Sequence, residues 1–96
     1  MLLKNARVDP SASNDYPIQY ASENGYLRVV ELLMADPRVD PSARDNYALR
    51  YAAQNGHVRV VELLLSDSRV DPTSLNNEAI RYAAESGHLR VVELLL

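Results

Sequence analysis

The chain has 96 residues, of which 47% are hydrophobic and 24% charged, and its formal net charge is −3. This length and composition predict a single soluble globular unit. Each arginine lies within a few residues of an acidic residue and not in a basic run. We therefore expect no binding to nucleic acid, which requires clustered positive charge.

The chain contains no cysteine, which excludes disulfides and thiolate metal sites. Because a reducing compartment suits such a sequence, the expected location is intracellular, in the cytoplasm. No segment approaches the roughly 18 consecutive apolar residues of a membrane span, and residues 1–7 lack the long apolar stretch of a signal peptide. The sequence therefore predicts no membrane partner.

Three motifs recur along the chain with a spacing of 31 residues. They are Val-Asp-Pro from Val8, Val39 and Val70, a glycine at Gly25, Gly56 and Gly87, and Arg-Val-Val-Glu-Leu-Leu from Arg28, Arg59 and Arg90. A fixed period of this length is typical of repeat architectures, in which each repeat buries its core against its neighbours. We expect one domain over residues 1–96, with a stub at 1–7 and repeats at about 8–38, 39–69 and 70–96.

Each repeat reads as a loop, a first helix, a glycine and a second helix. In the middle repeat the first helix is predicted over Tyr47–Asn55, and Gly56 ends it in the left-handed conformation. The second helix is predicted over Val58–Leu65. The helix N-caps expected in the three repeats are Asp15, Asn46 and Asn77.

The second helix is apolar on all sides except a narrow strip that carries Arg59 and Glu62. It should therefore be buried on most sides, with the strip facing water. The two charges are three residues apart and can pair. The same pairing is expected for Arg28 with Glu31 and for Arg90 with Glu93.

The first helix has two faces of different character. The small face consists of Ala48, Leu49, Ala52 and Ala53, and the opposite stripe consists of Tyr47, Arg50, Tyr51 and Gln54. Small residues permit close approach of neighbouring first helices. The stack should then curve with the first helices on its concave side, and the stripe should face the concavity.

The middle repeat resembles the ankyrin repeat, whose core pattern is Ala-Ala-x-x-Gly-His followed by x-Val-x-x-Leu-Leu. The matching residues are Ala52-Ala53-Gln54-Asn55-Gly56-His57, Val60-Val61 and Leu63-Leu64-Leu65, and the same register recurs in all three repeats, with Tyr26 in place of the histidine in the first. The resemblance implies an all-α fold, an ankyrin-type helix-turn-helix solenoid with extended connecting loops. It also implies a protein or peptide as the partner.

No set of residues forms a catalytic or metal-binding constellation, so we expect no enzyme, no catalytic residue, no cofactor and no metal. His57 and His88 occupy equivalent positions, roughly 8 to 10 Å apart, which is too far for two ligands of one zinc ion. They are interpreted as structural residues at the start of the second helix. Asp9, Asp40 and Asp71 precede prolines, where their side chains can bond the local backbone of a turn.

The favoured hypothesis is a non-enzymatic scaffold that binds a partner protein through its concave helix face and loop tips. Its candidate residues are Tyr16, Gln19, Glu23, Asn24, Tyr47, Arg50, Gln54, Asn55, Glu78, Arg81 and Glu85. Tyr16 and Tyr47 are the preferred anchors, because tyrosine is common at interface hot spots. The column Tyr20, Tyr51 and Tyr82 is interpreted first as packing and second as binding surface.

The alternative hypothesis is a structural spacer, or a fragment of a longer array that associates end to end. Met1-Leu2-Leu3 matches the close of a second helix, and Leu94-Leu95-Leu96 closes another. Both ends would leave apolar helix surface uncapped, whereas terminal repeats normally present a polar outer face.

Overall fold

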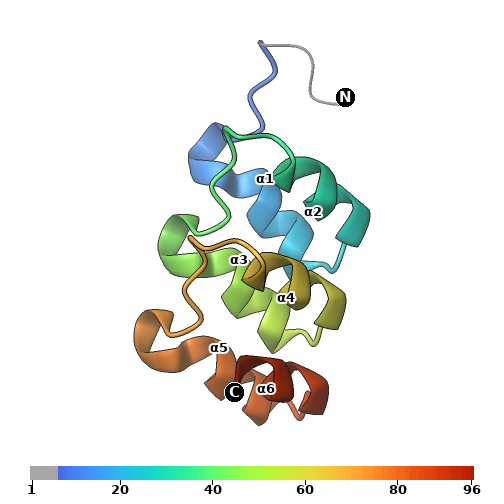
Figure 1. Ribbon diagram of the computed structural model, residues 1–96, viewed down its shortest axis with the longest axis vertical. Helices are drawn as coiled ribbons and strands as arrows, with labels where there is room; N and C mark the ends of the chain where they lie inside the picture. Colours follow the sequence, from blue (N-terminus) through green and yellow to red (C-terminus); the bar gives the residue numbers. More distant parts are fainter. Residues whose placement is uncertain (1–6) are drawn as a thin grey trace.

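The computed structural model describes residues 7–96, which form stacked helix pairs without a β-strand. The six helices of this part of the chain are α1 Ala12–Glu23, α2 Leu27–Met34, α3 Ala43–Gln54, α4 Val58–Leu65, α5 Ser74–Glu85 and α6 Leu89–Leu95. In Figure 1, α1, α3 and α5 form one layer and α2, α4 and α6 form a second. The all-α helix-pair solenoid predicted from the sequence is confirmed. Of the predicted stub, residues 1–7, only Arg7 lies within the described residues.

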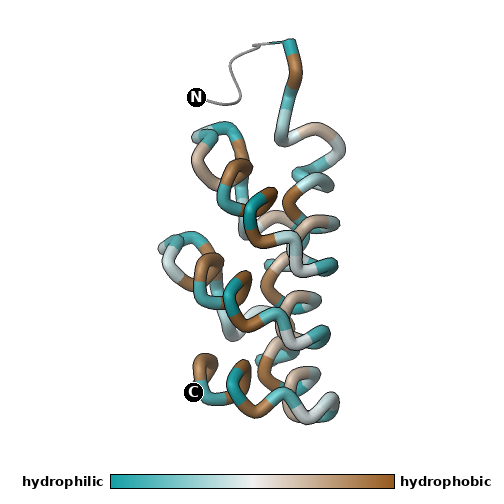
Figure 2. The backbone as a smooth tube through the Cα atoms, turned by 90° about the vertical axis from the view of Figure 1, so that its right-hand side faces the viewer, coloured by the Kyte–Doolittle hydropathy of each residue, from teal (hydrophilic) through white to brown (hydrophobic). Residues whose placement is uncertain are grey.

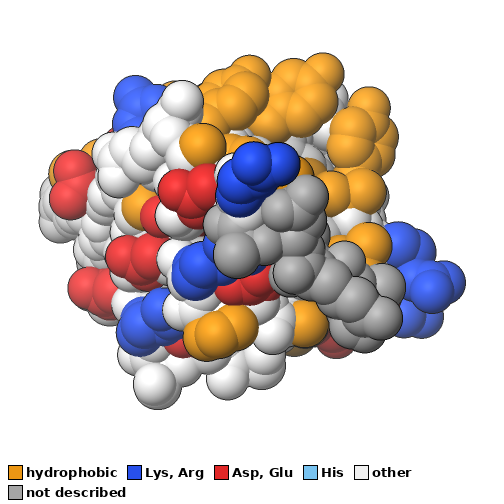
Figure 3. All heavy atoms as spheres, turned by 90° about the horizontal axis from the view of Figure 1, so that it is seen from above, with side chains coloured by type: hydrophobic (Ala, Val, Ile, Leu, Met, Phe, Trp, Pro, Cys, Tyr) orange, Lys and Arg blue, Asp and Glu red, His pale blue; other side chains and the backbone are white. Residues whose placement is uncertain are grey.

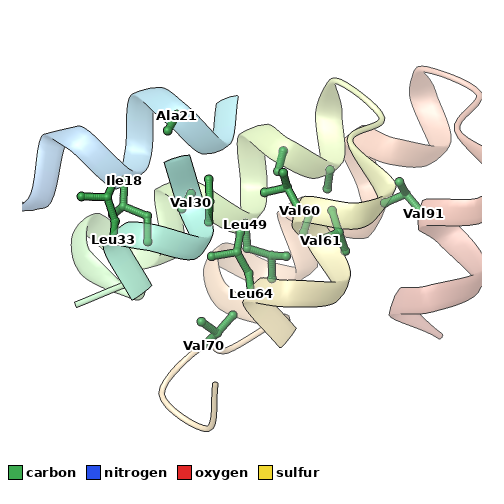
Figure 4. Packing of buried hydrophobic residues seen from close by; sticks show 14 of the residues in the cluster. Ile18, Ala21, Val30, Leu33, Leu49, Val60, Val61, Leu64, Val70 and Val91 are labelled. Carbon is green, nitrogen blue, oxygen red and sulfur yellow. The ribbon is translucent and has the colours of Figure 1, made fainter. Parts of the chain in front are cut away.

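The second helices bury their valine and leucine side chains against the first helices. In α4, Val60, Val61 and Leu64 are at most 1% exposed. Figure 4 shows these side chains together with apolar side chains of the neighbouring repeats, so that the core runs continuously along the stack. The prediction that this helix is buried on most sides is confirmed.

The charged strip of the second helices faces solvent. Arg28 Nε lies 3.2 Å from Glu31 Oε1, and Arg90 Nε lies 3.3 Å from Glu93 Oε1. These two predicted pairs are therefore present, and as exposed pairs they stabilise the helices by only a few tenths of a kcal/mol. The equivalent residues of α4 form no such pair among the described residues, so that part of the prediction was wrong.

The first helices pack on one another through small side chains. Ala48, Leu49, Ala52 and Ala53 of α3 are each at most 1% exposed. As the small-residue face predicts, contacts between successive first helices are more extensive than those between successive second helices. Figure 2 shows the two columns of helices side by side.

The loops between helix pairs are anchored in the core by the Val-Asp-Pro motif. Val39 is 1% exposed and Val70 is 8% exposed. Asp40 Oδ1 accepts hydrogen bonds from Ser42 N at 2.9 Å and Ser42 Oγ at 2.6 Å. The same turn occurs at Asp9 and Asp71, so the predicted local bonding of these aspartates is confirmed.

A second aspartate in each of the two loops between helix pairs forms an ion pair with the arginine two residues later. Asp36 Oδ2 lies 2.9 Å from Arg38 Nη2, and Asp67 Oδ2 lies 2.9 Å from Arg69 Nη2. In both cases the side-chain hydrogen bond from the arginine, helped by a backbone N–H, lowers the pKa of the aspartate below its usual value. These loops are therefore held by charge-assisted contacts as well as by the buried valines.

The start of each first helix differs from the expectation. The first three residues after Ala43, namely Arg44, Asp45 and Asn46, have φ values of 57°, 55° and 61°, which form a left-handed turn. The right-handed helix therefore begins at Tyr47, as predicted. Asn46 does not cap its own helix, because its Oδ1 accepts a hydrogen bond from the backbone N–H of Asp71 in the next repeat at 2.9 Å.

The same left-handed turn occurs in the other two repeats, over residues 13–15 and 75–77. Asp15 Oδ1 accepts from Asp40 N at 3.0 Å, so it too bonds the following repeat and not its own helix. Asn77 is exposed, with no such bond within the described chain. The three predicted N-caps were therefore wrong: the residues that precede the helices are Ser11, Ser42 and Thr73. Asp15 and Asn46 instead join neighbouring repeats.

Candidate functional site

The left-handed turns are held by one column of side chains from the first helices. Arg50 Nε donates to the carbonyl of Asp45 at 2.9 Å, and its Nη2 donates to the carbonyl of Arg44 at 3.1 Å. Arg81 makes the equivalent two bonds in the third repeat. A non-glycine residue in the left-handed region costs about 1 kcal/mol or more, so these bonds offset a local strain.

In the first repeat the same position is Gln19, which is 1% exposed. Its Nε2 donates to the carbonyl of Asn14 at 2.7 Å. The amide reaches one carbonyl where the guanidinium reaches two. The column Gln19, Arg50 and Arg81 therefore fixes the shape of the turns that precede the first helices.

An ion pair joins the second and third repeats. Arg50 Nη1 lies 2.7 Å from Glu78 Oε2, and the two side chains are 10% and 12% exposed. Between the first and second repeats, the residue equivalent to Glu78 is Tyr47, and its Oη donates to Glu23 Oε1 at 2.8 Å. Burial, and then this hydrogen bond with the Glu23 carboxylate, raises the pKa of Tyr47.

The glycines after α1 and α3 each receive the histidine of the next repeat. His57 Nε2 lies 3.0 Å from the carbonyl of Glu23, to which it donates. A Cβ placed on Gly25 would lie 2.5 Å from His57 Nδ1, and one on Gly56 would lie 2.6 Å from His88 Nδ1. The interpretation of both histidines as structural residues at the second-helix start is supported by this packing.

Tyrosine side chains of the first repeat are exposed together. Tyr16, Tyr20 and Tyr26 are 51%, 49% and 50% exposed. The ring centroids of Tyr16 and Tyr20 are 5.9 Å apart, and those of Tyr20 and Tyr26 are 6.4 Å apart. Viewed from the end that carries the first repeat, hydrophobic side chains gather along one edge, and acidic and basic side chains mix on the opposite edge (Figure 3).

The family model of ankyrin repeats, in three copies, matches residues 18–96. The chain belongs to the ankyrin-repeat family. No curated protein matches the chain. Ankyrin repeats are generally protein-protein interaction modules and are typically non-enzymatic.

The ankyrin stack separates the eleven predicted partner-binding residues into three groups by exposure. Exposed are Tyr16, Asn24, Asn55, Arg81 and Glu85, half-buried are Glu23, Tyr47, Gln54 and Glu78, and buried are Gln19 and Arg50. The buried pair holds the left-handed turns, and Glu78 is occupied by Arg50. The exposed group is accessible to a partner without any rearrangement of the ankyrin repeats.

Two surface tyrosines were not in the predicted set. Tyr20 was interpreted first as packing, yet its ring is half exposed, whereas the equivalent Tyr51 and Tyr82 are more buried. Tyr26 stands where the other ankyrin repeats have histidine, and this substitution was the one available signal for it.

Within residues 7–96, no group of three or more histidine or acidic side chains lies close enough to hold a metal ion. Among the described helices of the ankyrin stack, none is long and apolar enough to cross a membrane.

Proposed function

We propose that the chain binds a segment of another protein on the exposed face of its first helices, centred on the first repeat. The observation that carries this proposal is the group of half-exposed rings of Tyr16, Tyr20 and Tyr26. Tyrosine supplies a large amphipathic contact area at low cost in conformational entropy, so it is enriched at binding hot spots. The centroids of Tyr16 and Tyr20 are 5.9 Å apart and those of Tyr20 and Tyr26 are 6.4 Å apart, so one partner segment can contact all three rings.

The surrounding polar groups suit a protein surface. Asn24 and Asn55, which follow the first helices, are exposed. The side chains of both already donate to backbone carbonyls, at 2.9 Å each, so they are fixed in position. A rigid binding face loses little entropy when a partner docks, which supports affinity.

The experiment is a selection of peptides from a random displayed library against the purified chain. The affinities of enriched peptides are then compared for two variants. Tyr16→Ser/Tyr20→Ser removes rings from the proposed face, and Val29→Ser/Leu32→Ser removes side chains that are 44% and 42% exposed on α2. We expect the tyrosine variant to lose binding by about ten-fold or more, a typical hot-spot effect, and the α2 variant to retain it.

Circular dichroism of both variants checks that the fold is intact. If the selected peptides bind the tyrosine variant as tightly as the parent, or if the α2 variant loses binding instead, the proposed face is wrong. If no peptide is enriched over the unselected library, the proposal that the face takes an extended protein segment fails.

A second candidate is end-to-end association through the third repeat. Leu89 and Leu96 are 69% and 92% exposed, and a Cβ on Gly87 would meet nothing within 4 Å. The equivalent glycines each carry a histidine ring from the following repeat. Light scattering over a concentration series should then show a molar mass that rises with concentration. The Leu89→Glu variant should have a lower mass than the parent, and the Ser68→Glu variant should not. A concentration-independent monomer contradicts association.

A further inference from the structure

The first and second repeats carry equivalent tyrosine pairs on their first helices. Tyr16 and Tyr20 in α1 correspond to Tyr47 and Tyr51 in α3. The rings of the two pairs are inclined by the same 35°, with centroids 5.9 Å apart in α1 and 4.3 Å apart in α3. The two pairs therefore allow equivalent tyrosines to be compared in two environments.

In the second repeat, arginines of the chain lie over the pair. The Cζ atom of Arg44 lies 5.5 Å from the centroid of the Tyr47 ring. That of Arg50 lies 5.7 Å from the Tyr47 centroid and 5.4 Å from the Tyr51 centroid. Cations within about 6 Å of a ring centroid are attracted by the negative face of the aromatic system. The second pair is thus already occupied by two guanidinium groups.

The third repeat also has an arginine guanidinium over a tyrosine ring. It has one tyrosine in these columns, Tyr82, and the Cζ atom of Arg81 lies 5.9 Å from its centroid. Wherever the chain has both an arginine and a tyrosine at these equivalent positions, the guanidinium lies over the ring. The arrangement of the first helix therefore favours this contact by its geometry.

The first repeat has the rings without the arginines. Ser13 occupies the position of Arg44, and Gln19 occupies that of Arg50. Among the described residues, no cation lies over the rings of Tyr16, Tyr20 or Tyr26. All three rings are about half exposed, and Tyr26 adds an edge contact to Tyr20 at 6.4 Å with a 60° inclination.

The charge around this aromatic group favours a cation over other occupants. The chain has a net charge of −3, and Glu23 lies on the same helix one turn after Tyr20. An acidic segment would be repelled by this charge. A purely apolar segment would gain burial but would leave the tyrosine hydroxyls to find new partners.

We propose that Tyr16, Tyr20 and Tyr26 form a receptor for an arginine side chain of the partner protein, which supplies the guanidinium that Arg44 and Arg50 supply within the second repeat. This inference rests on the proposed function, because it names the chemistry that the first-helix face selects. It predicts that peptides recognised by the chain carry an arginine at the position that meets the first repeat.

The test uses two short synthetic peptides that differ in one side chain. Both are glycine-based and blocked at their ends. One carries a single arginine, and the other carries citrulline, which has the same shape without the charge. Binding is followed by nuclear magnetic resonance of the tyrosine rings. We expect the rings of the first repeat to shift with the arginine peptide, and its affinity to be about five-fold higher than that of the citrulline peptide (about 1 kcal/mol).

Substitutions at Ser13 provide a matched pair of variants. Ser13→Arg places an internal guanidinium where Arg44 stands in the second repeat, and the two positions share a φ of 57°. We expect it to occupy the rings and abolish the shifts. Ser13→Leu adds bulk without charge at the same exposed site and should leave the arginine peptide bound.

Several outcomes would overturn the arginine receptor. These are equal affinity for the arginine and citrulline peptides, equal affinity for a lysine peptide, and equal loss of binding in Ser13→Arg and Ser13→Leu. If the library selection yields peptides that need Tyr16 and Tyr20 but show no preference for arginine, the proposed function stands and this inference fails. If the library peptides bind without Tyr16 and Tyr20, the proposed function fails. The titration with the arginine and citrulline peptides still tests the arginine receptor independently.

Discussion

The three equivalent glycines allow the contact between repeats to be separated from the backbone strain of a helix end. Gly25, Gly56 and Gly87 have φ values of 74°, 74° and 77°, so an alanine at each meets the same left-handed penalty. Only the first two would also place a Cβ against a histidine ring, at 2.5 Å and 2.6 Å from Nδ1. Gly87 has nothing within 4 Å of that position.

The expected magnitudes follow from these two contributions. The left-handed conformation costs alanine roughly 1 to 2 kcal/mol, and this is all that Gly87→Ala should lose. Forcing an extra methyl group into a packed contact adds typically about 1 to 3 kcal/mol. Gly25→Ala and Gly56→Ala should therefore lower the free energy of unfolding by about 2 to 5 kcal/mol, summing the two.

Urea denaturation followed by far-ultraviolet circular dichroism measures these losses. In a His57→Ala background the ring is gone, so Gly25→Ala should cost no more than Gly87→Ala. Hydrogen exchange of the α5 and α6 amides shows whether the Gly87 penalty is confined to the third repeat. Equal losses at all three glycines, or a Gly25 penalty that His57→Ala leaves unchanged, would refute the packing argument.

Two further substitutions probe the charged contacts. Arg50→Met leaves the Glu78 side chain, which is 12% exposed, without its partner. Urea denaturation should show that the free energy of unfolding falls by about 2 to 4 kcal/mol, against about 1 kcal/mol for Arg81→Met. Equal losses in the two variants would contradict the role of the ion pair. The lowered pKa values of Asp36 and Asp67 mean that their stabilisation is complete above the unfolded-state pKa of about 4 and is lost as the pH falls through the lower folded-state value. Melting temperatures should therefore fall less steeply with acid in Asp36→Asn/Asp67→Asn, and an unchanged acid dependence would argue against these contacts.

The sequence by itself determined the repeat, the order of its helices and most of its core. Because the spacing is 31 residues, the same residue type occurs at equivalent positions of the three repeats, and an assignment made in one repeat can be checked in the other two. The helix end at Gly56 and the burial of Val61 depend on local conformation and on helical periodicity. Both properties can be read from neighbouring residues alone.

The left-handed turn before each first helix could not be predicted in this way. Arg44 and Leu75 adopt φ values of 57° and 55° although neither residue type favours that conformation. The turn is stabilised by contacts from elsewhere, including the guanidinium of Arg50 and the bond from Asn46 to the following repeat. Local propensity therefore gave only part of the signal: Asp45 and Asn46 are residue types that enter the left-handed region more readily, but the first residue of the turn is not, and part of the compensation comes from the following repeat.

The candidate site shows the same division. The sequence identified the first-helix stripe, but it could not show that Gln19 and Arg50 are buried while Tyr20 is half exposed. Equivalent residues differ in exposure because their surroundings come from the neighbouring repeats. Tyr47 contacts Glu23 of the preceding repeat and lies beneath Arg44 and Arg50, whereas Tyr16 has neither arginine in its own repeat. The sequence period thus determines which position of the repeat a residue occupies. The packing of the repeats determines whether that residue is exposed to a partner.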